Sequence, residues 1–130
     1  MKVPPGKYRS ARGKRAYAEG LNAEALACAA LQNNGWTILG QRLRTEAGEV
    51  DAVAERDGLV AFVEVKHRPN LLEAAYALTL RQRRRLLAAA EILMAENPDW
   101  GCNGVRFDVL LVDPAGNVRR VIDAFRVEET

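Results

Sequence analysis

Four charged side chains on two short apolar segments have the types and the spacing to do chemistry together. They are Glu49, Asp51, Glu64 and Lys66. The dipeptide Asp57-Gly58 between the segments favours a two-residue type I′ hairpin, because both central positions of that turn need φ > 0. With this loop Asp51 faces Glu64 across the hairpin, and Glu49 faces Lys66. Because side chains alternate along a strand, all four are expected on one face.

Asp51 and Glu64 would then be two like charges set directly opposite each other. Such a cross-strand pair destabilises a sheet by roughly 0.2–1 kcal/mol, so a plain hairpin gains nothing from it. A divalent cation between the carboxylates converts the repulsion into a binding site, and oxygen ligands of this kind suit Mg²⁺ or Mn²⁺. Lys66 on the same face could orient a water molecule or offset the charge of a phosphate. The pattern indicates metal-assisted hydrolysis of a phosphodiester.

The same charges fit a simpler interpretation, in which the hairpin has one solvated face and no chemistry. Val53 and Phe62 are expected on the charged face, however, so that face is not wholly open to solvent. This favours a lined pocket. The opposite face of the hairpin is expected to carry small apolar residues, namely Val50, Ala52, Ala54, Ala61, Val63 and Val65.

A helix over residues 14–34 is predicted to bring a further carboxylate to the hairpin. One row at helical spacing is apolar except for Glu24, and it consists of Tyr17, Gly20, Leu21, Glu24, Ala27, Cys28 and Leu31. A carboxylate in a core-facing row is costly unless it is paired or ligated. Glu24 is therefore expected to point toward Asp51, or, as the alternative, to lie at the rim with its charge in water. Glu19 belongs to another row and is expected to face solvent.

Local signals predict the remaining elements. Strands are predicted at residues 36–44, 105–112 and 118–124, with a strong turn signal at 113–117. A second long helix is predicted to start at Thr79, because Thr79 and Gln82 match a capping box. Gln82 is explained by that cap, although it could also touch a substrate. The order helix, three strands, helix, two strands is typical of an α/β architecture with a mixed five-stranded sheet flanked by helices.

Composition describes an ordinary globular protein. The chain has 130 residues, of which 48% are hydrophobic and 28% charged. We predict one domain over residues 13–126, with a flexible basic tail at 1–12 and a short tail at 127–130. No apolar run approaches the ~20 residues of a membrane span, and no secretory signal is recognisable. We therefore expect no membrane partner and, by default, a cytoplasmic location. Cys28, Cys102 and one histidine do not form a zinc or disulfide framework.

Basic residues gather at the N-terminal segment and at the start of the second long helix. Such patches supply the sequence-independent part of nucleic-acid affinity. Each patch alone would be an ordinary solvated surface, but both together with a candidate metal site indicate binding to DNA. The candidate nucleic-acid-binding residues are Lys14, Arg15, Arg68, Arg81, Arg84 and Arg85. Asp108 is expected to pair with a nearby arginine rather than to bind the metal.

The ordered set of motifs resembles the PD-(D/E)xK nuclease superfamily and, within it, the small bacterial YraN-type family. The matching motifs are Gly20-x-x-x-Glu24 with Gly35, Gly48-Glu49-Val50-Asp51, Phe62-Val63-Glu64-Val65-Lys66-x-Arg68, Arg106-Phe107-Asp108 and Asp123-Ala124-Phe125. That family is similar to the archaeal Holliday-junction resolvases. The resemblance covers roughly residues 13–125 and implies a restriction-endonuclease-like αβββαβ core.

The resemblance implies a Mg²⁺- or Mn²⁺-dependent endonuclease that acts on DNA, branched DNA included. Asp51 and Glu64 would hold the metal, Lys66 would orient or activate the attacking water, and Glu24 would contribute from the first helix. Glu49 is a candidate additional participant, as is Gln82. Resolvase relatives act as homodimers, so the resemblance allows a homodimer here.

Two departures from the superfamily pattern stand out. Val50 precedes Asp51 where the superfamily is named for a proline, and Gln82 stands where relatives tend to carry a lysine. The second departure puts substrate contact at that helix in doubt. The alternative function is a nucleic-acid-binding module, or a subunit of a DNA-processing complex, with little or no cleavage activity of its own.

Overall fold

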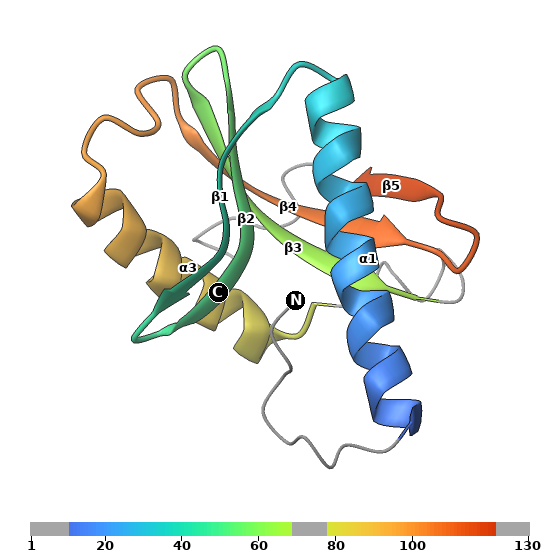
Figure 1. Cartoon of the computed structure of the whole chain (residues 1–130). Helices are drawn as coiled ribbons and strands as arrows, with labels where there is room; N and C mark the ends of the chain where they lie inside the picture. Colours follow the sequence, from blue (N-terminus) through green and yellow to red (C-terminus); the bar gives the residue numbers. More distant parts are fainter. Residues whose placement is uncertain (1–10, 69–77, 122–130) are drawn as a thin grey trace.

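The computed structural model describes residues 11–68 and 78–121, and within them the side chains of residues 22–68 and 78–120. Helices and strands follow one another in the predicted order (Figure 1). In sequence they are α1 (Ala11–Asn33), β1 (Thr37–Thr45), β2 (Gly48–Arg56), β3 (Leu59–His67), α3 (Leu80–Glu96), β4 (Val105–Val112) and β5 (Val118–Val121).

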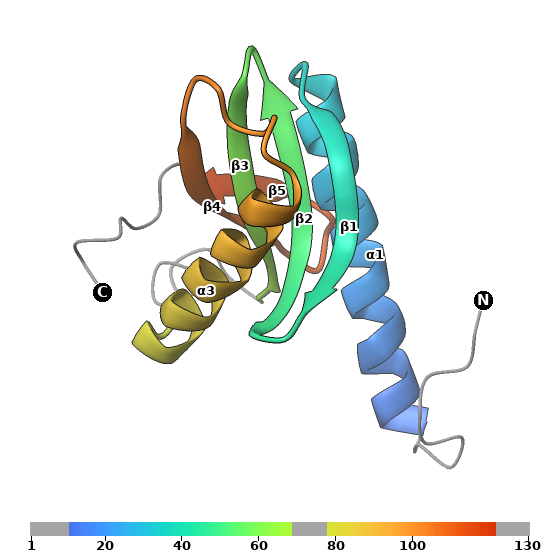
Figure 2. The same cartoon turned by 90° about the vertical axis from the view of Figure 1, so that its left-hand side faces the viewer.

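The strands form one mixed sheet in the order β1-β2-β3-β4-β5. Neighbouring strands are antiparallel except β3 and β4, which are parallel and are connected through α3. Helix α1 covers one face of the sheet and α3 the other (Figure 2). This confirms the predicted α/β fold, and it is consistent with a restriction-endonuclease-like core.

Element boundaries differ from the prediction mainly at the N-terminal end. Helix α1 begins at Ala11, so it includes the last two residues of the segment predicted to be a flexible tail. Alanine, arginine and lysine are strong helix formers, which accounts for the extension. Several other segments lie outside the described residues. They are the rest of the predicted N-terminal tail, the tail at 127–130, the motif at residues 123–125 and most of the connection between β3 and α3 at 71–78.

The β2–β3 hairpin has the predicted turn and register. Asp57 and Gly58 both have positive φ, 53° and 81°, as a type I′ turn requires. Pairing runs from Arg56–Leu59 to Ala52–Val63. The dipeptide therefore fixes which residues of the two strands face each other.

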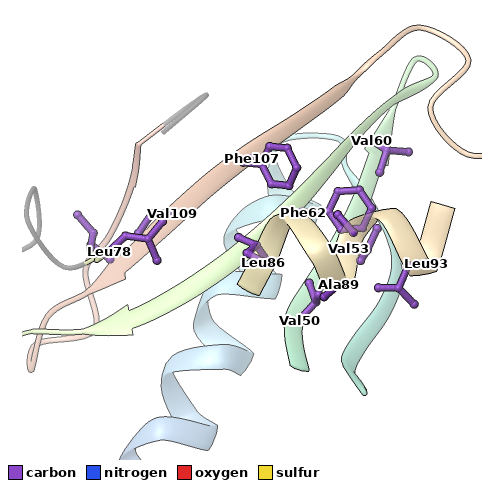
Figure 3. Packing of buried hydrophobic residues seen from close by; sticks show 12 residues of the cluster. Val50, Val53, Val60, Phe62, Leu78, Leu86, Ala89, Leu93, Phe107 and Val109 are labelled. Atoms are coloured by element: carbon purple, nitrogen blue, oxygen red, sulfur yellow. The ribbon is translucent and has the colours of Figure 1, made fainter. Parts of the chain in front are cut away.

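The core is split by the sheet into two layers of different character. On the α3 side it is aromatic: Phe62 is fully buried and stacks on Phe107 with 5.8 Å between ring centroids (Figure 3). On the α1 side small residues dominate, and Ala23 and Ala27 pack against Ala52 and other alanines of the sheet. Small side chains on both surfaces allow a close approach of α1 to the sheet.

Helix α3 begins with the predicted capping box. The Gln82 backbone N–H donates to the Thr79 hydroxyl at 3.1 Å, and the Gln82 side-chain oxygen accepts from the Thr79 backbone N–H at 2.9 Å. Buried Leu86, Ala89 and Leu93 then hold the helix against the aromatic layer. Within residues 11–68 and 78–121, neither helix combines the length and hydropathy needed to cross a membrane.

Candidate functional site

The regular pairing of β2 with β3 stops next to Asp51. Beyond the Ala52–Val63 pair, the backbone N–H of Val65 donates to the Asp51 carboxylate at 2.8 Å. A side chain thus occupies a position that a backbone carbonyl would hold in a continuous ladder. Figure 1 shows β2 diverging from β3 toward this end of the hairpin. The candidate site lies where the sheet opens.

The side chains around this opening are not all on one face, contrary to the prediction. Val50 packs in the α3-side cluster although Ala52 packs on the α1 side, so the alternation of β2 breaks at Asp51. Strand β1, the other neighbour of β2, is irregular too. Its register shifts between Ile38 and Gly40, and Arg42 has a φ of 48°. Since Val50 lies on the α3 side, alternation places Glu49 on the α1 side, where it affects the pKa of Glu24. Val63 and Val65 lie on the α1 side, so Glu64 and Lys66 are placed on the α3 side.

Asp51 and Glu64 meet as predicted, and the protonation of Glu64 is strongly altered there. The pKa of Glu64 is raised from its ordinary 4.5 to about 8. Burial is the largest cause, followed by a hydrogen bond with Asp51 and the Asp51 charge, while Lys66 and Arg85 act in the opposite direction. Two carboxyl groups in contact cannot both remain ionised cheaply, so at neutral pH the pair retains a proton.

Glu24 approaches the pair from α1, as the apolar helical row predicted. Its side chain is 20% exposed, and its Oε1 lies 3.8 Å from the Nε of Arg42. Burial and the nearby charge of Asp51 raise the pKa of Glu24, Arg42 lowers it, and Glu49 raises it further. Negative charge therefore concentrates on this side of the opening. The side chain of Glu19, the predicted solvent-facing residue, lies outside those described.

Arg85 of α3 is placed beside Glu64 by a glycine. A Cβ at Gly48, which has a φ of 144°, would lie 2.7 Å from Arg85 Cδ. The Arg85 side chain therefore runs across the β1–β2 turn where only glycine leaves room. The Thr45 hydroxyl shapes that turn by accepting the backbone N–H of Gly48 at 3.1 Å. A glycine directly before Glu49 is the one signal of this contact in the sequence.

The remaining predicted site residues are placed less centrally. Glu49 is 42% exposed and pairs loosely with Arg44 at 3.9 Å. Gln82 is engaged in the α3 cap, so its side chain is not directed at the carboxylates. Arg68 donates to the carbonyl of His67 at 2.8 Å. Arg81 and Arg84 are exposed on α3, and the side chains of Lys14 and Arg15 lie outside those described.

Asp108 is separate from this opening. It is fully buried, and Arg106 donates to its two oxygens at 2.9 and 3.0 Å. The prediction that Asp108 pairs with an arginine is confirmed.

Asp51 and Glu64 have the donor chemistry for a hard divalent cation. They supply carboxylate oxygens in contact, at an exposed end of the sheet, and Mg²⁺ commonly binds through one or two carboxylates with waters completing its shell. In the described part of the chain, no three acidic, histidine or cysteine side chains are grouped closely enough to hold a metal ion together. The residues fit a two-carboxylate site, with Glu24 near it but outside the ligand set.

Comparisons with known proteins agree on one family. The family model described as "Uncharacterised protein family UPF0102" matches residues 23–112, a segment that contains Glu24, Asp51, Glu64 and Lys66. A UPF0102 protein of Granulibacter bethesdensis is 59% identical over 91% of this chain and 75% of its own length. A UPF0102 protein of Azorhizobium caulinodans is 46% identical over 96% of this chain and 95% of its own. One from Rhodopseudomonas palustris is 46% identical over 85% of each.

Proposed function

The chain belongs to the uncharacterised protein family UPF0102, and we propose that it is a Mg²⁺- or Mn²⁺-dependent endonuclease that hydrolyses DNA. The observation that supports this most is the contact of Asp51 with Glu64 at the open end of the hairpin, with Lys66 close enough to affect Glu64. Such a contact destabilises a purely structural sheet by roughly 0.2–1 kcal/mol, and a bound cation would remove that cost. The resemblance to resolvases adds branched DNA as a substrate and a homodimer as the working form.

Asp51 and Glu64 would hold the metal, which supplies charge stabilisation for the phosphate and lowers the pKa of a bound water. The Val65 N–H fixes the Asp51 carboxylate, so this ligand is oriented before any substrate arrives. Lys66 and Arg85 carry positive charge on the same side as Glu64 and can offset the charge of a phosphate. Glu24 can accept a proton at the opposite side of the opening, because its raised pKa makes it a stronger base than an ordinary glutamate.

A second candidate function is a nucleic-acid-binding module that cleaves poorly or only within a complex. It is favoured by the small number of grouped ligands: the described residues bring together two carboxylates, not three. The exposed arginines of α3 would serve this function equally well.

Cleavage assays on the full chain separate the two functions. Labelled four-way junctions, forks and linear duplexes would be incubated with Mn²⁺, with Mg²⁺ and with chelator. We expect cleavage of at least one DNA form by the wild type, and its loss in Asp51→Asn and in Lys66→Ala. Asparagine retains an oxygen for the Val65 N–H, so the fold should persist. Glu91→Gln, an exposed change on α3, is the matched control and should cleave normally.

DNA binding is measured in parallel, with chelator present, at several salt concentrations. Affinity should fall steeply with salt and should survive both site substitutions, because it depends on arginines and lysines away from the carboxylates. Binding without cleavage of any form would favour the second function. Cleavage that persists in Asp51→Asn would contradict the assignment of the site.

A further inference from the structure

Three arginines gather around the indole of Trp36 on the α1 side of the sheet. The guanidinium carbons of Arg56, Arg106 and Arg120 lie 5.3, 5.3 and 5.4 Å from the ring centroid. They come from β2, β4 and β5, so the fold assembles them from distant parts of the chain. We call Trp36, the three arginines and Asp108 the arginine cluster.

Asp108 neutralises only part of this positive charge. It binds Arg106 through both oxygens, and its contact with Arg120 is longer, at 4.0 Å. Three positive charges and one negative leave the arginine cluster with a net charge of +2. Burial lowers the pKa of Arg120, Asp108 raises it, and the charges of Arg106 and Arg56 lower it again. Arg120 is thus held beside two other cations, with 23% of its side chain exposed.

Two donors of the arginine cluster are buried without an acceptor among the described residues. They are Nε1 of Trp36 and Nη1 of Arg120. Trp36 is only 3% exposed, so its N–H is also shielded from bulk water. By contrast, Arg56 donates to the carbonyl of Asn34 at 2.9 Å, and Arg106 is satisfied by Asp108. Leaving buried donors unpaired is costly, so an anionic acceptor that reaches Arg120 would relieve part of that cost.

A cavity gives such an acceptor access to Arg120. It has a volume of about 310 Å³ and is lined by Ala30, Leu31, Asn34, Leu110, Val118 and Arg120. The lining is apolar on most sides, which strengthens electrostatic attraction to an anion inside. Guanidinium groups match the oxygens of phosphate and carboxylate, and a net charge of +2 favours the more highly charged of these, a phosphate.

We propose that the arginine cluster is a binding site for a phosphate group, with Arg120 as the donor that lines the cavity. Glu24 borders the carboxylate site, and Leu31 lines the cavity. The two residues are two turns apart on α1, which corresponds to about 10 Å along the helix axis. The phosphate site is therefore distinct from the carboxylates, and it does not depend on whether the chain cleaves DNA. Inorganic phosphate and a phosphate carried by a nucleic-acid strand are the two sources with this chemistry.

The test is the thermal stability of the full chain in phosphate and in chloride of equal ionic strength, with chelator present. We expect phosphate to raise the Tm of the wild type in a saturable manner. Arg120→Gln should weaken phosphate affinity about tenfold or more, as expected for the loss of a charge-assisted hydrogen bond. Arg119→Gln, at the exposed neighbouring position on β5, is the matched control and should leave the affinity unchanged.

Arg120→Lys serves if Arg120→Gln fails to fold, because it retains the positive charge and removes the guanidinium donors. It should weaken phosphate binding and leave the chloride Tm less affected. The proposal is overturned if the wild type shows no shift beyond that in chloride, or if the folded site variants bind phosphate as the wild type does. Competition with an oligonucleotide, with and without a 5′-phosphate, then identifies the source. If either oligonucleotide displaces inorganic phosphate, the site binds a nucleic-acid phosphate. If neither displaces it, the site binds free phosphate.

Discussion

Asp108 and Glu64 lie on neighbouring strands of one sheet, and the protein stabilises them in opposite ways. Asp108 is fully buried on the α1 side, where Arg106 binds both of its oxygens. Glu64 lies on the α3 side, where another carboxylate contacts it and its pKa rises to about 8. Asp108 pairs in register with Val63, the residue before Glu64, so the two environments are adjacent in sequence and separated by the sheet.

The difference distinguishes a structural carboxylate from a candidate functional one. A buried carboxylate that contributes to folding is paired with a cation and stays ionised. One that is held next to another carboxyl group retains a proton at neutral pH, and a bound cation can take the place of that proton. Burial alone does not separate the two cases; the sign of the nearest charge does.

The largest effect is expected from Asp108. Asp108→Asn should reduce the free energy of unfolding by about 3–5 kcal/mol, the usual cost of removing one partner from a buried ion pair. Asp51→Asn should change it by less than about 1 kcal/mol, or increase it, because it relieves a like-charge contact. Denaturant unfolding of both variants, compared at equal m-values, measures the difference. Equal losses in the two variants would remove the distinction drawn between these carboxylates.

Metal ions should affect only the Asp51–Glu64 pair. Mn²⁺ or Mg²⁺ at a hundredfold excess over Kd should stabilise the wild type by about 2.7 kcal/mol. Asp51→Asn should lose that stabilisation, while Lys66→Ala should retain it. The measurement is Tm with and without the metal, and Glu91→Gln provides the control for the loss of a distant carboxylate. A metal-dependent shift of equal size in Asp51→Asn would place the cation elsewhere.

The pH dependence of stability should carry the signature of Glu64. Its folded-state pKa, about 8, lies above its ordinary value of 4.5, so the folded state binds the proton more tightly than the unfolded state does. Without metal, stability should therefore fall as the pH rises from about 4.5 to 8, by on the order of 1–2 kcal/mol. Glu64→Gln should flatten that part of the profile. A wild-type stability that rises through this range would contradict the assignment.

The features that the sequence predicted correctly depend on local signals. The Asp57-Gly58 turn fixed the register of the hairpin, because a two-residue loop leaves little freedom to the strands it joins. The lone charge in the apolar row of α1 identified Glu24, because such a row must face the sheet. The capping box located the start of α3. Each signal lies within a few residues of the feature it determines.

The features that the sequence did not predict depend on long-range contacts. The break in alternation at Asp51 accompanies a positive φ at Arg42 on the neighbouring strand and the hydrogen bond that Val65 N–H donates to Asp51. Neither feature has a signature near Asp51, so a regular strand was the natural expectation. The arginine cluster was missed because it combines residues from β2, β4 and β5 around Trp36. Arginines spaced this widely along a chain form no recognisable patch in the sequence.

The smallest effect is expected at Arg42, whose φ of 48° helps to open the sheet beside Asp51. A left-handed conformation costs a non-glycine residue roughly 1 kcal/mol, and its ion pair with Glu24 at 3.8 Å is half exposed and weak. Arg42→Gly and Arg42→Ala both remove the ion pair, but only glycine removes the strain. We therefore expect the free energy of unfolding of the glycine variant to be about 0.5–1 kcal/mol higher than that of the alanine variant. Urea unfolding of the two proteins at pH 7 measures this difference directly.

Metal-dependent stabilisation should persist in the glycine variant, since the opening depends on the backbone at residue 42 and not on its charge. If alanine proves as stable as glycine, the positive φ is not what separates the carboxylate pair from the regular sheet around Asp108.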